Sequence, residues 1–279
     1  MAIKKVLTIA GSDSSGGAGL QADLKTFQEL GVYGMTGITC IVTMDPKGWH
    51  HNVFPIDTTL LEKQLDTIMS VGIDGMKTGM LGTVEIIELV ARKIDEHQLK
   101  HVVIDPVMVC KGEDEVLNPE TADAMRELLL PRAYVVTPNL FEAGQLAGIK
   151  TPKTIEEMQE AAVKIHDQGA KFVLIKGGSK LQTEDKSIDL LYDGKEFQIY
   201  ESEKIETSYT HGAGCSNSAA VAAEIAKGNS VYDAVDVAKR FVSAGIQQGF
   251  PLNEYVGPTW HGAYRSKKAN TEYCEDCGE

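Results

Sequence analysis

Short apolar runs alternate with amphipathic segments along almost the whole chain. Several runs are apolar at consecutive positions, which is typical of strands in a parallel sheet covered on both faces. We expect strands at Lys5–Ala10, Thr36–Thr43, Gly75–Thr78, His101–Asp105, Ala133–Thr137 and Lys171–Lys176. Helical patterns lie between them, at Ala18–Leu30, Thr59–Val71, Val84–His97, Pro119–Leu130 and Ile155–Gln168. Repeated strand–helix–strand units predict an α/β fold with one mainly parallel sheet and helices on both faces.

The pattern changes near Lys186. Ser187–Tyr192 and Glu196–Tyr200 flank a turn of the Asp-Gly kind, which predicts an antiparallel hairpin. Two helices of small residues follow, at about 213–227 and 231–249. Because no repeat or linker interrupts the sequence, we expect a single domain over residues 1–266 and a flexible polar tail over 267–279.

Charge and composition narrow the classes of partner. The chain has 27 Lys and Arg against 40 Asp and Glu, a formal net charge of −13, which argues against binding nucleic acid or anionic membranes non-specifically. No apolar run approaches the roughly 20 residues that span a bilayer, and the short apolar start is typical of a first strand. Five scattered cysteines do not resemble a disulfide framework, and Cys274 and Cys277 lack a second pair that would complete a zinc site. We therefore expect a cytoplasmic protein.

The most informative motif is Thr210-His211-Gly212-Ala213-Gly214-Cys215, which directly precedes an Ala-rich helix. Its two glycines allow the backbone to turn so that successive N–H groups point into one cavity, and the helix adds the positive end of its dipole. Such a pocket suits the charge that develops on phosphoryl oxygens during transfer. The alternative is a Gly-rich helix start that binds nothing.

Cys215 stands where a helix N-terminus is expected to lower a thiol pKa from its usual value of about 8.5. A thiolate there could accept the proton of an attacking hydroxyl, which is the role of a general base. The alternative is a small buried side chain without chemistry, as free cysteine often is.

A second Gly-rich motif, Gly11–Asp23, follows the first expected strand and opens the first helix. It lacks the Lys-Ser/Thr of a P-loop, which excludes a P-loop nucleotidase, and it fails the dinucleotide fingerprint, which disfavours a dehydrogenase. A strand-to-helix turn at the carboxyl edge of a sheet is still a common ligand site. Asp13 and Asp23 could accept hydrogen bonds from a polar substrate ring, although Asp13 could instead cap the turn.

Further polar residues follow three other expected strands. Asn139 and Glu142 share one face at the start of a helix and could hold Mg²⁺ through water, although the same spacing is that of a capping box. Asp105 ends a neighbouring strand and could add a second carboxylate. Lys176 ends another, before two glycines, and could reach a phosphate.

Taken together, these motifs resemble the ribokinase-like superfamily. The motifs are Gly-Ala-Gly-Cys, Asn-x-x-Glu, Asp-Pro-Val-Met, Lys-Gly-Gly and the opening Ala-Gly-Ser-Asp-x-Ser-Gly-Gly-Ala-Gly-x-Gln-Ala-Asp, and they run in order from Val6 to about Pro258. The opening motif is similar to the branch that holds hydroxymethylpyrimidine (phosphate) kinases and related pyridoxal kinases. Most other members of the superfamily carry Asp where this chain has Cys215, and a cysteine there is typical of this branch.

The resemblance implies a three-layer α-β-α sandwich in which ATP and substrate meet above the carboxyl edge of the sheet. It implies an anion hole at Gly212–Cys215 with Cys215 as base, and a metal site for Mg²⁺ at Asp105 and Glu142, and it allows a monovalent cation. The nucleotide side would include Asn139, Lys176, Thr210, His211 and Gly214. The substrate side would include Gly11, Asp13, Gly19, Asp23, Met44, His51 and Met80.

Two positions favour a B6 vitamer over a pyrimidine. Where hydroxymethylpyrimidine kinases have Gln-Asn after the second strand, this chain has Met44-Asp45, and a thioether cannot pair with the pyrimidine's amino edge. Cys110 lies in a polar loop of the kind that closes over an active site, and a thiol can add to the aldehyde of pyridoxal. Met44 could instead simply end the strand against the core.

The sequence therefore predicts an ATP-dependent kinase of pyridoxal, pyridoxine and pyridoxamine, with hydroxymethylpyrimidine (phosphate) kinase as the alternative. The rival from another class is a binding protein that has kept the fold without turnover. Small apolar strands at the edge of the sheet favour a homodimer.

Overall fold

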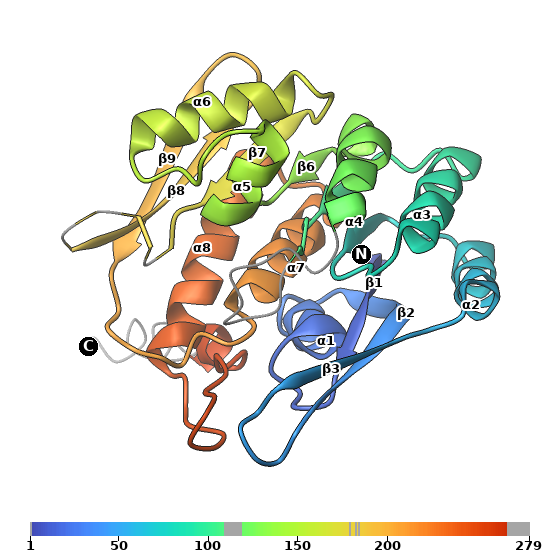
Figure 1. Cartoon of the computed structure of the whole chain (residues 1–279), viewed down its shortest axis with the longest axis horizontal. Helices are drawn as coiled ribbons and strands as arrows, with labels where there is room; N and C mark the ends of the chain where they lie inside the picture. The colour runs from blue at the N-terminus through green and yellow to red at the C-terminus, as the bar shows by residue number, and fades with distance from the viewer. Residues whose placement is uncertain (1, 109–118, 179, 182, 184, 267–279) are drawn as a thin grey trace, which may run out of the picture.

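A nine-stranded sheet forms the centre of the computed structural model, which describes residues 2–108, 119–178, 180–181, 183 and 185–266 (Figure 1). The strand order is β3-β2-β1-β4-β5-β6-β7-β8-β9. The strands are β1 (Lys5–Asp13), β2 (Tyr33–Met44), β3 (His51–Pro55), β4 (Gly75–Thr78), β5 (Val102–Ile104), β6 (Val135–Val136), β7 (Phe172–Lys176), β8 (Lys186–Tyr192) and β9 (Phe197–Glu203).

The sheet is mixed rather than purely parallel. Neighbouring strands from β2 through β7 run parallel, whereas β3, β8 and β9 each pair antiparallel to their neighbours. The predicted α/β architecture is confirmed. The predicted hairpin is also confirmed, because the ends of β8 and β9 lie within a few residues of the expected strand ends. Strand β3 was not predicted, because His51–Pro55 is short and only partly buried and carries no continuous apolar run.

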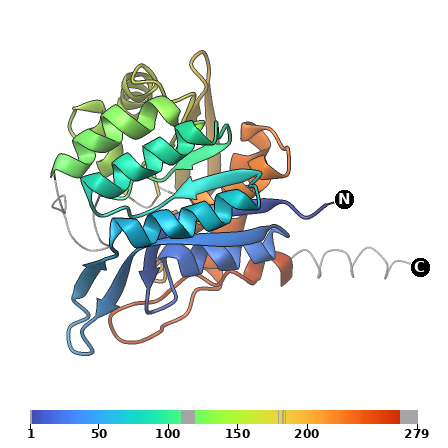
Figure 2. The same cartoon turned by 90° about the vertical axis from the view of Figure 1, so that its right-hand side faces the viewer.

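Helices cover both faces of the sheet (Figures 1 and 2). On one face lie α1 (Gly19–Glu29), α7 (Ala213–Ala226) and α8 (Val231–Gln247). On the other lie α2 (Thr58–Ser70), α3 (Val84–Glu96), α4 (Pro119–Ala124), α5 (Leu140–Ala147) and α6 (Ile155–His166). The helix expected at Pro119–Leu130 is α4 followed by a π-turn, η1 (Met125–Leu129), and a 3₁₀ turn, η2 (Leu130–Arg132).

Two hydrophobic cores follow from the alternation of side chains along the strands. Successive strand residues point to opposite faces. Val6 and Val135 therefore belong to the core beneath α1, α7 and α8, while Leu7 and Val136 belong to the core beneath α2 to α6. This is why the central strands are apolar at consecutive positions.

Helix α7 explains the small residues near the end of the chain. It is buried around its whole circumference between the sheet, α1 and α8, which only short side chains allow. At Gly75 of β4, a Cβ atom would lie 3.2 Å from the Ala226 side chain, so the glycine lets the strand approach the helix closely. The packing fixes the N-terminus of α7 against the centre of the sheet.

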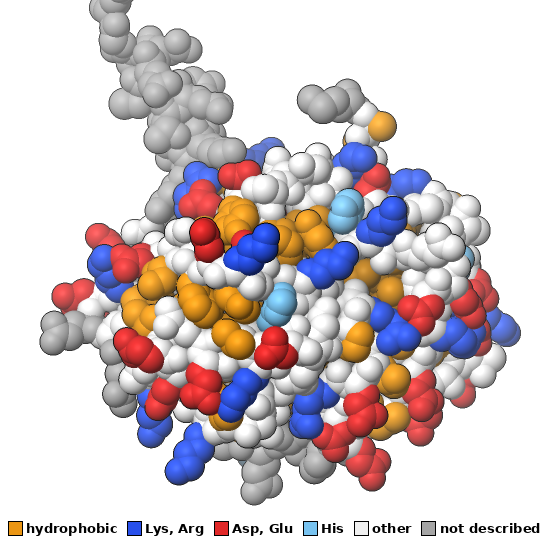
Figure 3. Space-filling view, turned by 90° about the horizontal axis from the view of Figure 1, so that it is seen from above, with side chains coloured by type: hydrophobic (Ala, Val, Ile, Leu, Met, Phe, Trp, Pro, Cys, Tyr) orange, Lys and Arg blue, Asp and Glu red, His pale blue; other side chains and the backbone are white. Residues whose placement is uncertain are grey.

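Among the described residues, no helix is long and apolar enough to cross a membrane. On the face seen from above Figure 1, positive and negative side chains are intermixed around a strip of hydrophobic side chains (Figure 3). The surplus of acidic residues is therefore not gathered into one field on that face. The expected tail over 267–279 lies outside the described residues.

Candidate active site

A cavity of about 720 Å³ lies at the carboxyl edge of the parallel strands. Because these strands run in one direction, the polar residues that follow β1, β4, β5, β6 and β7 all reach this edge. The cavity collects most of the predicted site residues. They are Gly11, Asp13, Gly19, His51, Met80, Asp105, Asn139, Glu142, Lys176, Thr210, His211, Gly212, Ala213, Gly214 and Cys215.

The N-terminus of α7 forms the expected turn toward the cavity. Gly212 is the N-cap, with a left-handed φ of 82°, and it provides no side-chain cap. A Cβ atom on Gly212 would lie 1.8 Å from the carbonyl oxygen of Gly17, so only glycine fits between the two loops. Since an α-helix leaves its first N–H groups without partners in the helix, this turn can offer N–H donors to an anion.

Cys215 lines the cavity, but its protonation differs from the expectation. Burial raises the pKa of its thiol to about 11, and the Lys77 ammonium and the Gly19 N–H oppose this only in part. The prediction that the helix N-terminus lowers the thiol pKa is wrong for the protein without ligands, because the loss of water around the sulfur outweighs the nearby positive charge.

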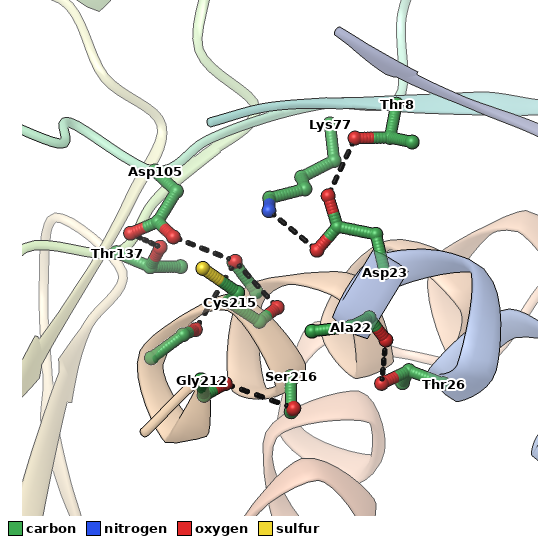
Figure 4. A network of polar contacts seen from close by, with 12 residues as sticks. Thr8, Ala22, Asp23, Thr26, Lys77, Asp105, Thr137, Gly212, Cys215 and Ser216 are labelled. Atoms are coloured by element: carbon green, nitrogen blue, oxygen red, sulfur yellow. Dashed lines mark hydrogen bonds and ion pairs between the residues drawn. The ribbon is translucent and has the colours of Figure 1, made fainter. Parts of the chain in front are cut away.

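Asp23 does not contact the cavity, contrary to the prediction that it binds substrate. Its side chain is fully buried and forms an ion pair with Lys77, with Lys77 Nζ 2.7 Å from Asp23 Oδ1. Thr8 Oγ1 donates to the other carboxylate oxygen at 2.6 Å (Figure 4). Although burial disfavours the Lys77 ammonium, Asp23 raises the pKa of Lys77 above its usual value. Lys77 itself lines the cavity.

Asp13 and His211 come from loops far apart in the sequence and bind each other. His211 Nε2 lies 2.8 Å from Asp13 Oδ2, and the Asp13 carboxylate also accepts the N–H groups of Ser15 and Ala18. Burial acts to raise the pKa of Asp13, but the hydrogen bonds from His211 and Ser15 lower it to about 2. The turn-capping alternative for Asp13 is confirmed, and Asp13 still borders the cavity.

On the other side of the cavity, Asn139 and Glu142 form the capping box that the spacing allowed. The Glu142 N–H donates to Asn139 Oδ1 at 2.9 Å, and the Asn139 N–H donates to Glu142 Oε2 at 2.8 Å. Burial raises the pKa of Glu142 to about 7. A buried carboxyl group beside an amide fits Mg²⁺, because a cation would favour its ionised form.

Asp105 anchors a second network. Its carboxylate accepts from Lys176 Nζ at 3.0 Å, from Ser218 Oγ at 2.9 Å and from Thr137 Oγ1 at 3.3 Å. These contacts tie β5, β6, β7 and α7 together below the cavity. No group of three or more potential metal ligands occurs among the residues that the structure describes. The role of Asp105 as a metal ligand therefore stays a prediction.

The substrate side is less fully predicted. Met44, the last residue of β2, does not line the cavity, whereas Val42, two residues earlier on the same strand, does. The structure therefore adds no support to the argument from a thioether at Met44, and the role of Met44 stays a prediction. Cys110 and its loop over 109–118 lie outside the described residues.

Sequence reasoning missed several lysines that border the cavity, among them Lys77 and Lys239. Lys77 sits in a four-residue strand whose residues are all buried, and a charged residue in such a strand was the available signal. Lys239 of α8 forms an ion pair with Asp189 at 2.9 Å and lies 3.2 Å from Ser187 Oγ. Its position inside a helix of small residues gave no local sign of the cavity.

Comparison with known proteins gives consistent relatives. The profile of a family described as phosphomethylpyrimidine kinase matches residues 13–260. Pyridoxine kinase of Bacillus subtilis is 62% identical over 267 residues, covering 95% of this chain and 98% of that protein. Hydroxymethylpyrimidine/phosphomethylpyrimidine kinase of the same organism is 44% identical over 97% of this chain and 99% of that protein.

Solved structures agree with these sequences. An ADP complex of Bacillus subtilis pyridoxal kinase has a TM-score of 0.91 and 61% identity, covering 95% of this chain and 99% of that one. Pyridoxal kinase of Staphylococcus aureus in complex with AMP-PCP and pyridoxal has a TM-score of 0.90 and 52% identity, with 95% of each chain covered.

Proposed function

The chain belongs to the phosphomethylpyrimidine kinase family, and we propose that it is an ATP-dependent kinase that phosphorylates the 5′-hydroxymethyl group of pyridoxal, pyridoxine and pyridoxamine. Pyridoxine kinase of Bacillus subtilis, at 62% sequence identity, is more similar to this chain than the hydroxymethylpyrimidine/phosphomethylpyrimidine kinase of the same organism, at 44%. The observation that carries the proposal is that the α7 turn, Cys215, Lys176 and Glu142 all line one cavity. The finer description of the fold as a ribokinase-like three-layer sandwich, and of residues 1–266 as one domain, belongs to the same proposal.

In the proposed mechanism, the substrate hydroxyl attacks the γ-phosphorus of ATP in line. Backbone N–H groups of Gly212, Gly214 and Cys215 stabilise the charge that develops on the phosphoryl oxygens, while the Ala213 N–H donates to the Thr210 carbonyl oxygen. Lys176 binds a nucleotide phosphate. Cys215 Sγ accepts the hydroxyl proton. Enclosure in the cavity brings the two reactants together and keeps water away from the transferring group.

Glu142 and Asn139, with Asp105 behind them, would hold Mg²⁺, which neutralises charge on the ATP phosphates when bound. A monovalent cation beside the nucleotide and a cytoplasmic location complete the proposal. We also propose a homodimer through the β2–β3 edge. There Ile41 and Phe54 lie directly opposite each other and are 42% and 57% exposed.

ATP turnover by the purified protein tests the function. Pyridoxal, pyridoxine, pyridoxamine and hydroxymethylpyrimidine are compared in parallel, each at several concentrations. We expect a clearly higher kcat/KM for the B6 vitamers. A higher value for hydroxymethylpyrimidine would support the alternative, a hydroxymethylpyrimidine (phosphate) kinase. This alternative is tested because the chain is 44% identical to such an enzyme. No turnover with any of the four would favour a binding protein.

A further inference from the structure

The ion pair between Lys77 and Asp23 has no role in the mechanism above, although Lys77 lines the same cavity as the α7 turn. Both side chains are 0% exposed, and Thr8 completes the hydrogen bonding of the carboxylate. Burying two charges is costly even when they pair, so such a pair does not explain itself by stability. We therefore look for its role in its position near the groups that line the cavity.

Lys77 and Cys215 line the same cavity and come from different elements. Lys77 comes from β4, in the centre of the sheet, and Cys215 from the first turn of α7. Figure 4 shows the Lys77 ammonium and the Cys215 sulfur turned toward the space between Asp23 and Asp105. Asp23 binds the Lys77 ammonium and is itself held by Thr8, which fixes the position of the ammonium.

Four charged side chains interact electrostatically with the thiol. Lys77 on β4 and Lys176 at the end of β7 are cations, while Asp23 on α1 and Asp105 after β5 are carboxylates. Burial has the largest influence on the thiol pKa and raises it. Among the neighbouring charges that act on it, Lys77 has the strongest effect and lowers the pKa, whereas Asp23 and Asp105 raise it.

We propose that Lys77, held by Asp23 and Thr8, is a positioning residue whose ammonium stabilises negative charge on Cys215 Sγ, an inference that rests on the proposed kinase function. In the step that it serves, the thiolate takes the proton of the substrate hydroxyl. The hydroxyl oxygen bonds to the γ-phosphorus while the bond from that phosphorus to the ADP oxygen breaks. The new S–H group then exchanges its proton with water, which restores the equilibrium between the thiol and its minor thiolate form.

The reactivity of Cys215 in the ligand-free protein tests this directly. Lys77→Met removes the charge and keeps most of the side-chain length. Alkylation of each cysteine by iodoacetamide, followed by peptide mass spectrometry between pH 7 and 10, reports its thiolate fraction. We expect Cys215 to react at least tenfold more slowly in K77M, while buried Cys40 reacts as in the wild type. An unchanged rate at Cys215 would overturn the proposal.

Lys93→Met is the matched control. Lys93 is also a nearly buried lysine, 7% exposed and 2.6 Å from Asp66, but it lies on α3 and does not border the cavity. K93M should leave the Cys215 rate unchanged. Equal slowing in both variants would show a general effect of lost ion pairs and would also overturn the proposal.

Lys77→Met leaves Asp23 buried without its cation, which strongly destabilises such pairs. If K77M does not fold, the double variant Lys77→Met with Asp23→Asn has no unpaired charge. Because Lys77 acts on the thiol more strongly than Asp23, the double variant should still slow alkylation of Cys215, by a smaller factor. A wild-type rate in the double variant refutes the proposal.

These rates need no turnover, so the test is separate from that of the kinase function. A wild-type protein that phosphorylates none of the vitamers would refute the function and leave the alkylation result standing. In an active enzyme, K77M should lower kcat and leave KM for ATP within a few-fold, because the lysine acts on the thiol and not on the nucleotide. A rise in KM for ATP with kcat unchanged would contradict that assignment.

Discussion

At the scale of single residues, Cys215 offers two distinct contributions to transfer, its thiol and its backbone N–H. Burial raises the pKa of the thiol to about 11, so the thiolate that could act as base is its minor form at neutral pH. The N–H group donates regardless of protonation. Variants that change only the side chain therefore separate the two.

Cys215→Ala removes the thiol and keeps every backbone donor of the anion hole. General-base catalysis contributes about 10²–10⁴-fold, so we expect kcat to fall within that range while KM for ATP changes little. Steady-state kinetics with pyridoxine provide the measurement. A kcat equal to that of the wild type would remove the base assignment and leave the anion hole as the main contributor.

His261 predicts how stability depends on pH. Its Nε2 lies 2.9 Å from Ser216 Oγ, next to Cys215. Burial, with a smaller effect of Lys25, lowers its pKa from 6.5 to about 4. Between these values the unfolded chain binds the proton more readily, so the folded state gains stability as pH rises from 4 to 6.5 and loses it as pH falls.

Because His261 is buried, the lowered pKa should change the free energy of unfolding by about 3 kcal/mol between pH values well below 4 and well above 6.5. Denaturant unfolding of the wild type and of His261→Gln at pH 4.5, 5.5, 6.5 and 7.5 gives the measurement. The rise in free energy of unfolding over this range should be clearly smaller in H261Q. Parallel curves for the two proteins would contradict a buried neutral imidazole.

Residues were predictable where their chemistry depends on local spacing, and unpredictable where it depends on partners distant in sequence. The motif Thr210–Cys215 and the Asn139–Glu142 box are local, and both lie at the cavity. Asp23 was misassigned because its partner Lys77 is 54 positions away, and no local pattern distinguishes a substrate carboxylate from a buried ion pair. The strand before Met44 was expected to end at Thr43 and in fact includes Met44, because the end of a strand cannot be located to one residue from sequence.

At the scale of elements, the site depends on two Gly-rich turns packed against each other. The turn after β1 and the turn before α7 meet at Gly17 and Gly212, with His211 beside them. A Cβ atom on Gly17 would lie 2.4 Å from the His211 ring. The two turns are therefore in close contact, and a methyl group at either glycine would force them apart.

Gly212→Ala tests that contact against a matched glycine. Gly228 has a similar left-handed φ of 96°, but a Cβ atom there meets nothing within 4 Å. Gly228→Ala should therefore cost only the backbone strain of about 1–2 kcal/mol. Gly212→Ala has the same strain plus the contact with Gly17, so we expect a larger loss of stability and a fall in kcat of at least tenfold. Thermal unfolding and kinetics of both variants provide the comparison, and equal effects would show that backbone strain alone matters.

Elements were predicted where burial imposes periodicity. The parallel strands and most helices appear at the expected places, because each must bury an apolar face. The prediction was incomplete where partners decide the structure. Strand β3 exists through its pairing with β2, and the π-turn after α4 reflects packing that no helical pattern reveals.

At the scale of the whole molecule, the sheet ends in two edge strands with different surfaces. On the β3 side, Phe54 and Ile41 are exposed next to each other, whereas on the β9 side Phe197 and Ile199 are 37% and 36% exposed. Exposed apolar edges favour association with a second chain. The larger exposed area on the β3 side makes it the proposed dimer edge.

Phe54→Glu should disrupt a dimer formed through β3, because it places a charge in the interface. Ile199→Glu introduces the same charge at the opposite edge of the sheet and should leave the assembly intact. Light scattering after size exclusion gives the mass, which we expect to be twice 30.3 kDa for the wild type and I199E, and 30.3 kDa for F54E. A monomeric wild type would contradict the proposed dimer, and dissociation of I199E alone would move the interface to β9.

The bond between Asp13 and His211 joins residues 198 positions apart. During synthesis, the turn that contains Asp13 leaves the ribosome early, but its partner His211 follows only after most of the chain has been made. Contacts of such sequence separation form slowly, and domains complete them only when the later segments are available. An incomplete or truncated product therefore cannot assemble the phosphate-binding turn against the first loop. The complete arrangement of this side of the cavity therefore depends on a finished polypeptide.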